Sequence, residues 1–255
     1  LVEEQYHVYN RSLLPALRQN GLKIITSHEH LTKYEGTYVD SYFEEMVYPV
    51  LTPMAVDSSR PFPLIRNKSL NIAALVKKKK GDSELDFAMV RVPSGLPRVV
   101  VIPPEEGKEK EGTSVIFLEE IIERNIEKLF LNYDIICSHP FRVMRNADLS
   151  IDEDEAEDLL KEIERQLKKR QWGEAIRLDI EEKADKRLLK ILKKELKVTN
   201  DEIYEISGLL DLTVLMKVYG LPGFDRYKAP GYTPQPVPAL MNEDDIFTNI
   251  RKNDI

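Results

Sequence analysis

Apolar residues near the start of the chain recur every three or four positions, which is the period of one face of a helix. They are Val2, Tyr6, Tyr9, Leu13 and Leu17. Because Pro15 lies inside this pattern, we predict a helix that breaks and starts again near Ser12. Asn20 and Gly21 provide a stop signal, and the short apolar run at residues 22–25 predicts a strand.

The part of the chain before residue 118 is dominated by short runs rich in Val, Ile, Leu and Phe. They lie at residues 70–76, 85–92, 98–102 and 114–117, separated by charged or turn-like stretches. This pattern is typical of an antiparallel meander. A helix is predicted over 37–47. The segment 49–63 contains four prolines, which predicts an extended connector.

The second half of the chain alternates between the two kinds of pattern. We predict helices over 118–130, 185–196 and 211–218, and strands over 133–137, 141–144, 175–180 and 203–206. The clearest helix signal starts at Asp152, where six of the seven residues 152–158 are acidic. Acidic residues suit the start of a helix, so we favour this interpretation over a cation site.

Together these patterns predict an α+β fold with a mixed, largely antiparallel sheet and helices packed on it. Glycines and prolines without an apolar period fill residues 220–238, which indicates a boundary, and a further helix is expected from Asp244. The helical pieces at the two ends look like parts of neighbouring domains, so we expect the chain to be a fragment.

Composition excludes some classes of protein. The 255 residues carry 44 acidic and 37 basic side chains, a net charge of -7, which argues against a dedicated nucleic-acid binder. The single cysteine, Cys137, cannot form an internal disulfide and is expected to be a buried, reduced thiol. No apolar run approaches the length of a membrane span. The expected location is the cytoplasm, with peripheral attachment at the inner membrane left open.

Histidines offer little recognisable chemistry. His28 and His30 could supply two metal ligands, but no third His or Cys lies near them in sequence, so we interpret them as part of a solvated loop and expect no metal site. His7 is expected to be exposed. His139 precedes Pro140 between two predicted strands and is expected to have a structural or a turn role. The sequence contains no glycine-rich phosphate-binding loop.

Two basic sets are candidates for contact with phosphate. Residues 77–80 are four consecutive lysines, which read either as a solvated hairpin tip or as a contact for a polyanion. Arg142, Arg145 and Arg177 lie on predicted strands. They are candidates either for phosphate contact or for ion pairs with the many acidic residues of the chain.

Several long motifs resemble bacterial polyphosphate kinases of the large, histidine-dependent type. Residues 49–57 read PVLTPMAVD and are followed by RPFP, similar to the family's PVLTPLAVD and HPFPF; further matches are SLNIA at 69–73, FRVMRNADL at 141–149, DEDEAEDLL at 152–160, GEAIRL at 173–178 and GLLDL at 208–212. Departures are small: Met144 stands where Thr is usual, Leu209 where Pro is usual, and Arg66 adds a charge.

The resemblance implies a division of the chain into three parts. Residues 1–21 would be the last helix of an N-terminal helical domain, 22–232 a middle or head domain, and 233–255 a linker with the start of the first catalytic domain. It also implies a head related to phosphohistidine phosphatases in fold and a homodimer formed through the head.

The activity implied for the whole protein is transfer of the terminal phosphoryl group of ATP to polyphosphate through a phosphohistidine, with Mg²⁺. The family's catalytic histidines match no residue here, so the chain alone is expected to be inactive, to bind neither ATP nor Mg²⁺, and to serve assembly and scaffolding. The alternatives are a stand-alone polyphosphate-binding adaptor and a phosphatase-like domain that uses His139 with Arg142 and Arg145.

Overall fold

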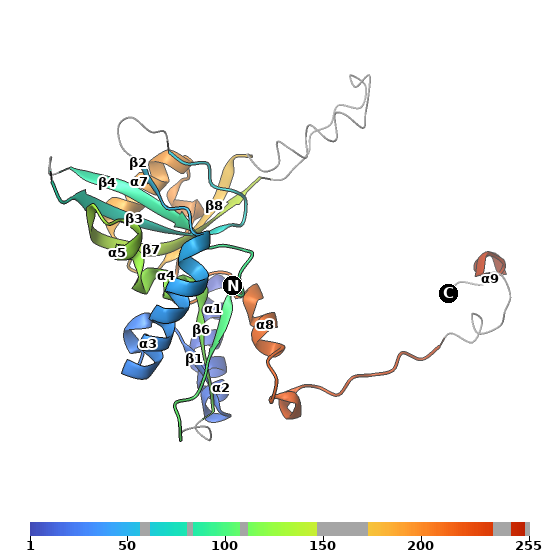
Figure 1. Cartoon of the computed structure of the whole chain (residues 1–255). Coiled ribbons are helices and arrows are strands. Elements are labelled where there is room, and N and C mark those ends of the chain that lie inside the picture. Colours follow the sequence, from blue (N-terminus) through green and yellow to red (C-terminus); the bar gives the residue numbers. More distant parts are fainter. Residues whose placement is uncertain (57–61, 81–83, 108–111, 147–172, 237–245, 253–255) are drawn as a thin grey trace, which may run out of the picture. The chain divides into compact units, whose positions relative to one another are not determined.

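A computed structural model describes residues 1–56, 62–80, 84–107, 112–146, 173–236 and 246–252. The chain divides into two compact units, Leu1–Leu215 and Met216–Ile255. The first unit contains two β-sheets with helices packed on them (Figure 1). The predicted α+β class with mixed, largely antiparallel pairing is therefore confirmed. The helix predicted from Asp152 lies outside the described residues, and the three-part domain division stays a prediction.

The chain begins with one continuous helical segment. It consists of α1 (Val2–Val8), a π-helical turn (Tyr9–Leu13) and α2 (Leu14–Gln19). The predicted break near Ser12 is wrong, because the backbone stays helical through that residue. The π turn comes directly before the turn that holds Pro15, and widening the helix there accommodates a residue that lacks an N–H donor. The helix ends at Asn20, and Gly21 takes a positive φ of 85° as predicted for a stop.

The larger sheet has six strands in the order β2-β4-β3-β7-β8-β9. The strands are β2 (Met54–Val56), β3 (Leu70–Lys78), β4 (Leu85–Arg91), β7 (Tyr133–Arg145), β8 (Ala175–Glu181) and β9 (Ile203–Ile206). All neighbours pair antiparallel except β8 and β9, which are parallel. The strands predicted at 133–137 and 141–144 are one strand, since His139 and Pro140 continue the pairing with β3.

Helix α7 (Lys186–Leu196) covers this sheet and completes its core. Asp185 caps the helix by accepting a hydrogen bond from the backbone N–H of Arg187 at 2.8 Å. Its buried residues Leu188, Leu192 and Leu196 pack with residues of four strands and the connector between β2 and β3, among them Ile65, Leu75, Phe87, Met89, Phe141 and Leu178. The pattern of the sequence therefore placed this helix correctly.

The smaller sheet has three strands in the order β1-β6-β5. In it β1 (Leu22–Ile25) runs parallel to β6 (Thr113–Phe117), which pairs antiparallel with β5 (Val99–Ile102). The predicted single meander is therefore wrong, because β4 and β5 belong to different sheets. Two prolines, Pro93 and Pro97, bracket the connection between them and cannot donate to a continuing ladder.

Helices α3 (Lys33–Tyr42), α4 (Leu118–Arg124) and α5 (Ile126–Leu129) belong to the same unit. Helix α3 begins before the predicted residue 37 because Thr32 and Glu35 form a capping box. It passes into a π turn (Phe43–Val47) and a 3₁₀ turn (Tyr48–Val50). The helix predicted over 118–130 divides at Asn125, whose backbone is not helical.

The C-terminal segment carries short elements. A 3₁₀ turn (Leu212–Val214) leads into α8 (Leu215–Tyr219), a further 3₁₀ turn spans Asp225–Tyr227, and α9 covers Ile246–Lys252. The described residues between 220 and 236 contain no strand. No helix in the described ranges is both long and apolar enough to cross a lipid bilayer.

Candidate functional site

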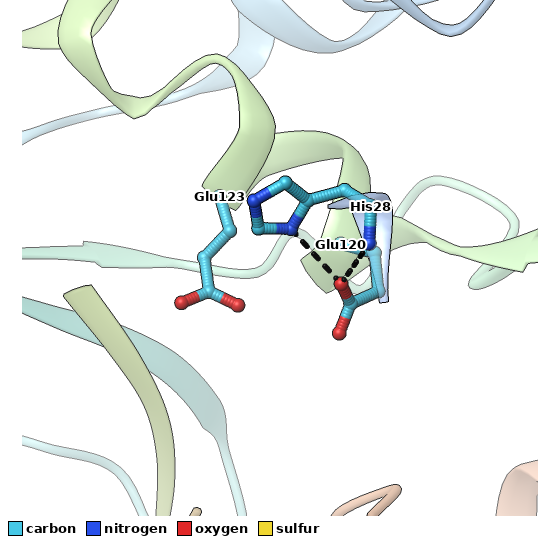
Figure 2. A group of neighbouring side chains, drawn as sticks. All are labelled: His28, Glu120 and Glu123. Carbon is cyan, nitrogen blue, oxygen red and sulfur yellow. Dashed lines mark hydrogen bonds and ion pairs between the residues drawn. The ribbon is translucent and has the colours of Figure 1, made fainter. Parts of the chain in front are cut away.

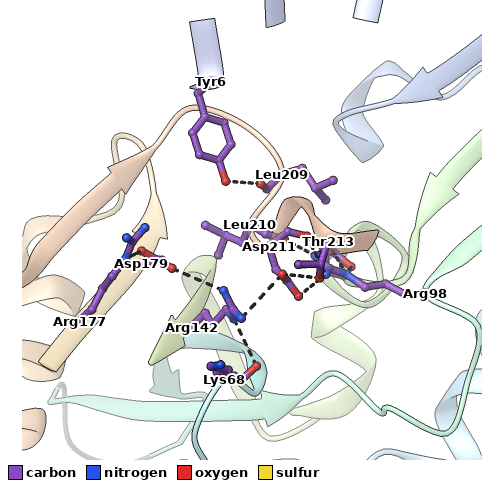
Figure 3. A network of polar contacts seen from close by, with 11 residues as sticks. Tyr6, Lys68, Arg98, Arg142, Arg177, Asp179, Leu209, Leu210, Asp211 and Thr213 are labelled. Carbon is purple, nitrogen blue, oxygen red and sulfur yellow. Dashed lines mark hydrogen bonds and ion pairs between the residues drawn. The ribbon is translucent and has the colours of Figure 1, made fainter. Parts of the chain in front are cut away.

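Arginines and carboxylates converge where the smaller sheet, the larger sheet and the segment 207–214 meet (Figure 3). Arg98, which precedes β5, donates to the Glu119 carboxylate from Nη2 at 2.6 Å and from Nε at 3.1 Å. Its guanidinium also reaches Asp211 Oδ2 at 3.3 Å and the carbonyl of Leu210. Glu119 is 4% exposed, and burial raises the pKa of its carboxyl in spite of the bonds from Arg98.

Arg142 and Arg177 share one buried carboxylate, that of Asp179. Arg177 Nε lies 2.5 Å from Asp179 Oδ1, and its guanidinium stacks 4.0 Å from the centre of the Tyr204 ring. Arg142 Nη1 lies 3.9 Å from Asp179 Oδ2, and its Nη2 lies 3.7 Å from Asp211 Oδ1. Figure 3 shows Arg142 between the two carboxylates. The sequence left open whether Arg142 and Arg177 contact phosphate or pair with acidic residues, and in the structure both pair with acidic residues.

Arg145 stands apart from this cluster. Its Nε donates to the carbonyl of Ile65 and its Nη1 to the carbonyl of Gly173, both at 2.8 Å. Burial lowers the pKa of this guanidinium. The structure thus brings together Arg142 and Arg177 but not Arg145, whose bonds join the connector before β3 to the residues before β8.

Sequence reasoning missed four members of the cluster: Arg98 and the carboxylates of Glu119, Asp179 and Asp211. Asp211 has a left-handed backbone with φ 63°, and its side chain makes no capping hydrogen bond to the backbone of the following turn. Its carboxylate accepts from Thr213 Oγ1 at 2.7 Å and pairs with two arginines. The only sequence signal was its place in the GLLDL motif. Its partner Arg98 lies 113 residues away.

The N-terminal helix is tied to the same segment. The hydroxyl of Tyr6 donates to the carbonyl of Leu209 at 2.8 Å, and Asn10 Nδ2 donates to the carbonyl of Ser207 at 2.7 Å. Burial raises the pKa of Tyr6 to about 12, so the phenol keeps its proton for this bond. The helix is consequently part of the frame around the cluster (Figure 3).

His28 and His139 each pair with a carboxylate. Nδ1 of His28 lies 3.1 Å from Glu120 Oε2, and Glu123 of the same helix lies close by (Figure 2). The solvated loop predicted for His28 is therefore wrong, whereas His30 and His7 are exposed. Burial and the neighbouring carboxylates raise the pKa of Glu123 to about 9.

His139 is held at both ring nitrogens. Its Nδ1 lies 2.8 Å from Glu181 Oε2, and its Nε2 lies 3.3 Å from the backbone nitrogen of Asp185. The backbone N–H of Asp185 can only donate in this second contact. Nε2 therefore accepts and Nδ1 donates. The residue lies within β7 and not in a turn, so that part of its prediction is wrong, but a structural role is consistent with these bonds.

The lysine run at 77–80 and Cys137 are the two remaining candidates from the sequence. The lysines at 77–80 are exposed at the β3–β4 hairpin, where Lys78 lies 3.7 Å from Asp86. Cys137 is a free thiol that packs against the core but is only partly buried, and desolvation raises its pKa. A raised pKa disfavours the reactive thiolate.

Comparison with known proteins identifies the class of domain to which this fold belongs. The family described as "Polyphosphate kinase middle domain" matches residues 35–218. The crystal structure of the polyphosphate kinase from Porphyromonas gingivalis has the same fold over 92% of this chain and 32% of that one, with a TM-score of 0.69 and 22% sequence identity. The fold is thus that of a middle domain found in a larger kinase.

Sequence relatives make the assignment specific. The polyphosphate kinase of Halalkalibacterium halodurans is 42% identical over all of this chain and 36% of that protein, and the one of Aphanizomenon baltica is 40% identical over all of this chain and 70% of that protein. The chain therefore belongs to the polyphosphate kinase family. It spans about a third of the length of most of the relatives it matches.

Proposed function

We propose that this chain is the frame of a polyphosphate kinase and carries no chemistry of its own. The whole enzyme transfers the terminal phosphoryl group of ATP to polyphosphate through a phosphohistidine, with Mg²⁺, in the cytoplasm. Within it, this domain holds the neighbouring parts in place and forms the contact of a homodimer.

The observation that supports this proposal most is the state of the candidate catalytic side chains. Both ring nitrogens of His139 have partners within the fold, at 2.8 and 3.3 Å, so neither is free to attack phosphorus. Arg142 and Arg145, which would have to stabilise the transferred charge, are bonded to carboxylates and carbonyls of the same domain. These contacts also argue against the phosphatase-like alternative.

The test is an assay of ATP-dependent polyphosphate synthesis with the chain alone and with a full-length relative as positive control. We expect turnover by the full-length enzyme only. Turnover by the chain that exceeds background, and that is lost in His139→Asn, would overturn the proposal. The homodimer is tested separately by light scattering on the purified chain, where a mass of one chain at all concentrations would contradict it.

A second candidate function, binding of polyphosphate without chemistry, is supported by the exposed lysines. Lys78, Lys79 and Lys80 line a shallow hollow with Asn132 and Tyr133 at the tip of the β3–β4 hairpin. A chain of phosphates would meet several point charges there. Titration with polyphosphate at low and high salt decides, because contacts with phosphate weaken as salt rises.

Matched variants locate any such contact. Lys79→Glu should abolish binding if the hairpin tip is responsible, whereas Arg177→Gln should abolish it if the arginine cluster is. Lys186→Glu, at the start of α7, is the control for net charge. If neither Lys79→Glu nor Arg177→Gln weakens binding of polyphosphate, neither the hairpin nor the arginine cluster is its binding surface.

A further inference from the structure

A group of donor atoms outside the arginine cluster has the composition of a metal site. His28 follows β1, and Glu120 and Glu123 lie one helical turn apart on α4. One ligand atom from each of the three residues lies within 4.8 Å of the other two. Figure 2 shows the imidazole between the two glutamates, whose carboxylates point to the same side.

Glu123 is the one carboxylate around this group that has no cationic partner among the described residues. Carboxylates of four glutamates gather here, and three of them pair with an arginine or a histidine: Glu119 with Arg98, Glu120 with His28, and Glu181 with His139. Among the described residues, no lysine, arginine or histidine forms an ion pair with Glu123. Its only hydrogen bond to a described residue comes from Ser138 Oγ to Oε1 at 3.2 Å.

Glu123 is also deeply buried, with 8% of its surface exposed. A buried carboxylate without a positive partner is costly, and proteins satisfy such groups with a proton, a cationic side chain or a metal ion. The second oxygen of Glu123 accepts no hydrogen bond from the described part of the chain. The carboxylate lies on the same side as that of Glu120, and His28 and Glu120 offer the remaining ligand atoms within 4.8 Å (Figure 2).

We propose that His28, Glu120 and Glu123 bind a divalent first-row transition-metal ion, for which Zn²⁺ is the probe. Donor atoms around a tetrahedral zinc ion stand roughly 3.3 Å apart, because each lies about 2.0 Å from the metal. The contact of His28 Nδ1 with Glu120 Oε2, at 3.1 Å, already has this spacing. The ligand atom of Glu123 lies within 4.8 Å of the other two, so it has to approach each of them by at most about 1.5 Å to reach the tetrahedral spacing.

Neighbouring groups support the two carboxylates as ligands. The backbone N–H of His28 donates to Glu120 Oε2 at 2.9 Å, and Ser138 orients Glu123. A cavity of about 40 Å³, lined by Thr26 and Glu181 among others, borders the group at Glu120. It has room for a water molecule beside that carboxylate.

The donor set selects the class of metal. An imidazole nitrogen with two carboxylate oxygens suits Zn²⁺ or Mn²⁺, whereas Mg²⁺ prefers oxygen ligands alone and keeps most of its waters. The ion would join the turn after β1 to α4, two segments 92 residues apart in sequence. Its effect is structural, and it is independent of whether the domain contributes to phosphoryl transfer.

The test is isothermal titration of the chain, stripped with EDTA and dialysed, with ZnCl₂. We expect one saturable site with micromolar or tighter affinity that an excess of Mg²⁺ leaves unchanged. His28→Ala, Glu120→Gln and Glu123→Gln should each weaken binding at least about tenfold. The matched controls are His30→Ala, an exposed histidine of the same turn, and Glu127→Gln, an exposed glutamate just beyond α4; both should bind like the parent chain.

The outcomes are unambiguous if folding is checked by far-ultraviolet circular dichroism for every variant. Glu123→Gln keeps the shape of the side chain, so it serves if His28→Ala fails to fold. Absence of saturable binding would overturn the proposal. So would binding that survives in folded Glu123→Gln, or binding that is lost in Cys137→Ser or His139→Asn, since either would assign the ion to another site.

Discussion

Replacing Arg98 by methionine should destabilise the domain more than any other single arginine change. Arg98 holds the carboxylate of Glu119, which is 4% exposed, through bonds of 2.6 and 3.1 Å. Methionine removes the charge but keeps an apolar stem of similar length, so the packing loss is small. What remains is a buried carboxylate that has lost its counter-charge.

The size of the effect follows from that uncompensated charge. Removing one partner of a buried ion pair costs about 3–5 kcal/mol. Arg98 retains 18% side-chain exposure, so water can reach part of the vacated space and the lower end, about 3 kcal/mol, is the expected loss in the free energy of unfolding. Because Arg98 also contacts Asp211 and Leu210, the segment 207–214 should become more mobile at the same time.

The assay is urea unfolding followed by circular dichroism at neutral pH in the presence of EDTA. The double variant Arg98→Met with Glu119→Met should recover most of the lost stability, since no charge is left unpaired. Arg187→Met is the control: Arg187 is 56% exposed in its pair with the half-buried Asp185, which still caps α7 without it, and the unfolding midpoint should hardly move. A loss below about 1 kcal/mol for Arg98→Met, or a double variant no more stable than the single one, would refute the reasoning.

Three further outcomes are expected from the same unfolding assay. The pKa of Glu123 is raised from an ordinary 4.5 to about 9, so between these pH values the native state holds a proton that the unfolded chain releases, and the free energy of unfolding should fall as pH rises. Metal-free Glu123→Gln should lack this fall and exceed the parent chain by about 3 kcal/mol at pH 7. Parallel pH profiles of the two proteins would contradict this. Tyr6→Phe loses the bond to Leu209 and should cost about 1 kcal/mol, with no change expected if the helix is not docked. Leu192→Ala should cost about 2–5 kcal/mol because the residue is fully buried, whereas a surface position would cost almost nothing.

Local signals in the sequence predicted most of the elements. Asp185 marks the start of α7 and the spacing of its leucines marks its buried face, while Asn20 and Gly21 mark the end of the N-terminal helix. These features depend on residues within one or two turns of each other. Even the missed start of α3 had a local signal, since Thr32 and Glu35 have the spacing of a capping box.

The arrangement of these elements could not be predicted in the same way. Nothing in the runs at 85–92 and 98–102 says that they enter different sheets, and the parallel pairing of β1 with β6 joins residues about ninety positions apart. The candidate sites depend on such long-range contacts. Arg98 meets Asp211 because the segment 207–214 lies against the residues before β5, and His28 meets Glu120 because β1, which precedes His28, pairs with β6, which leads into α4.

The most direct test of the proposed role is the search for a phosphorylated histidine on this chain. The purified domain is incubated with γ-labelled ATP and Mg²⁺, and protein-bound label that is stable to alkali but labile to acid is counted, with a full-length relative as the positive control. Because both nitrogens of His139 are engaged within the fold, we predict label on the full-length enzyme only. Acid-labile label on the isolated chain, lost in His139→Asn or His28→Ala, would contradict the account.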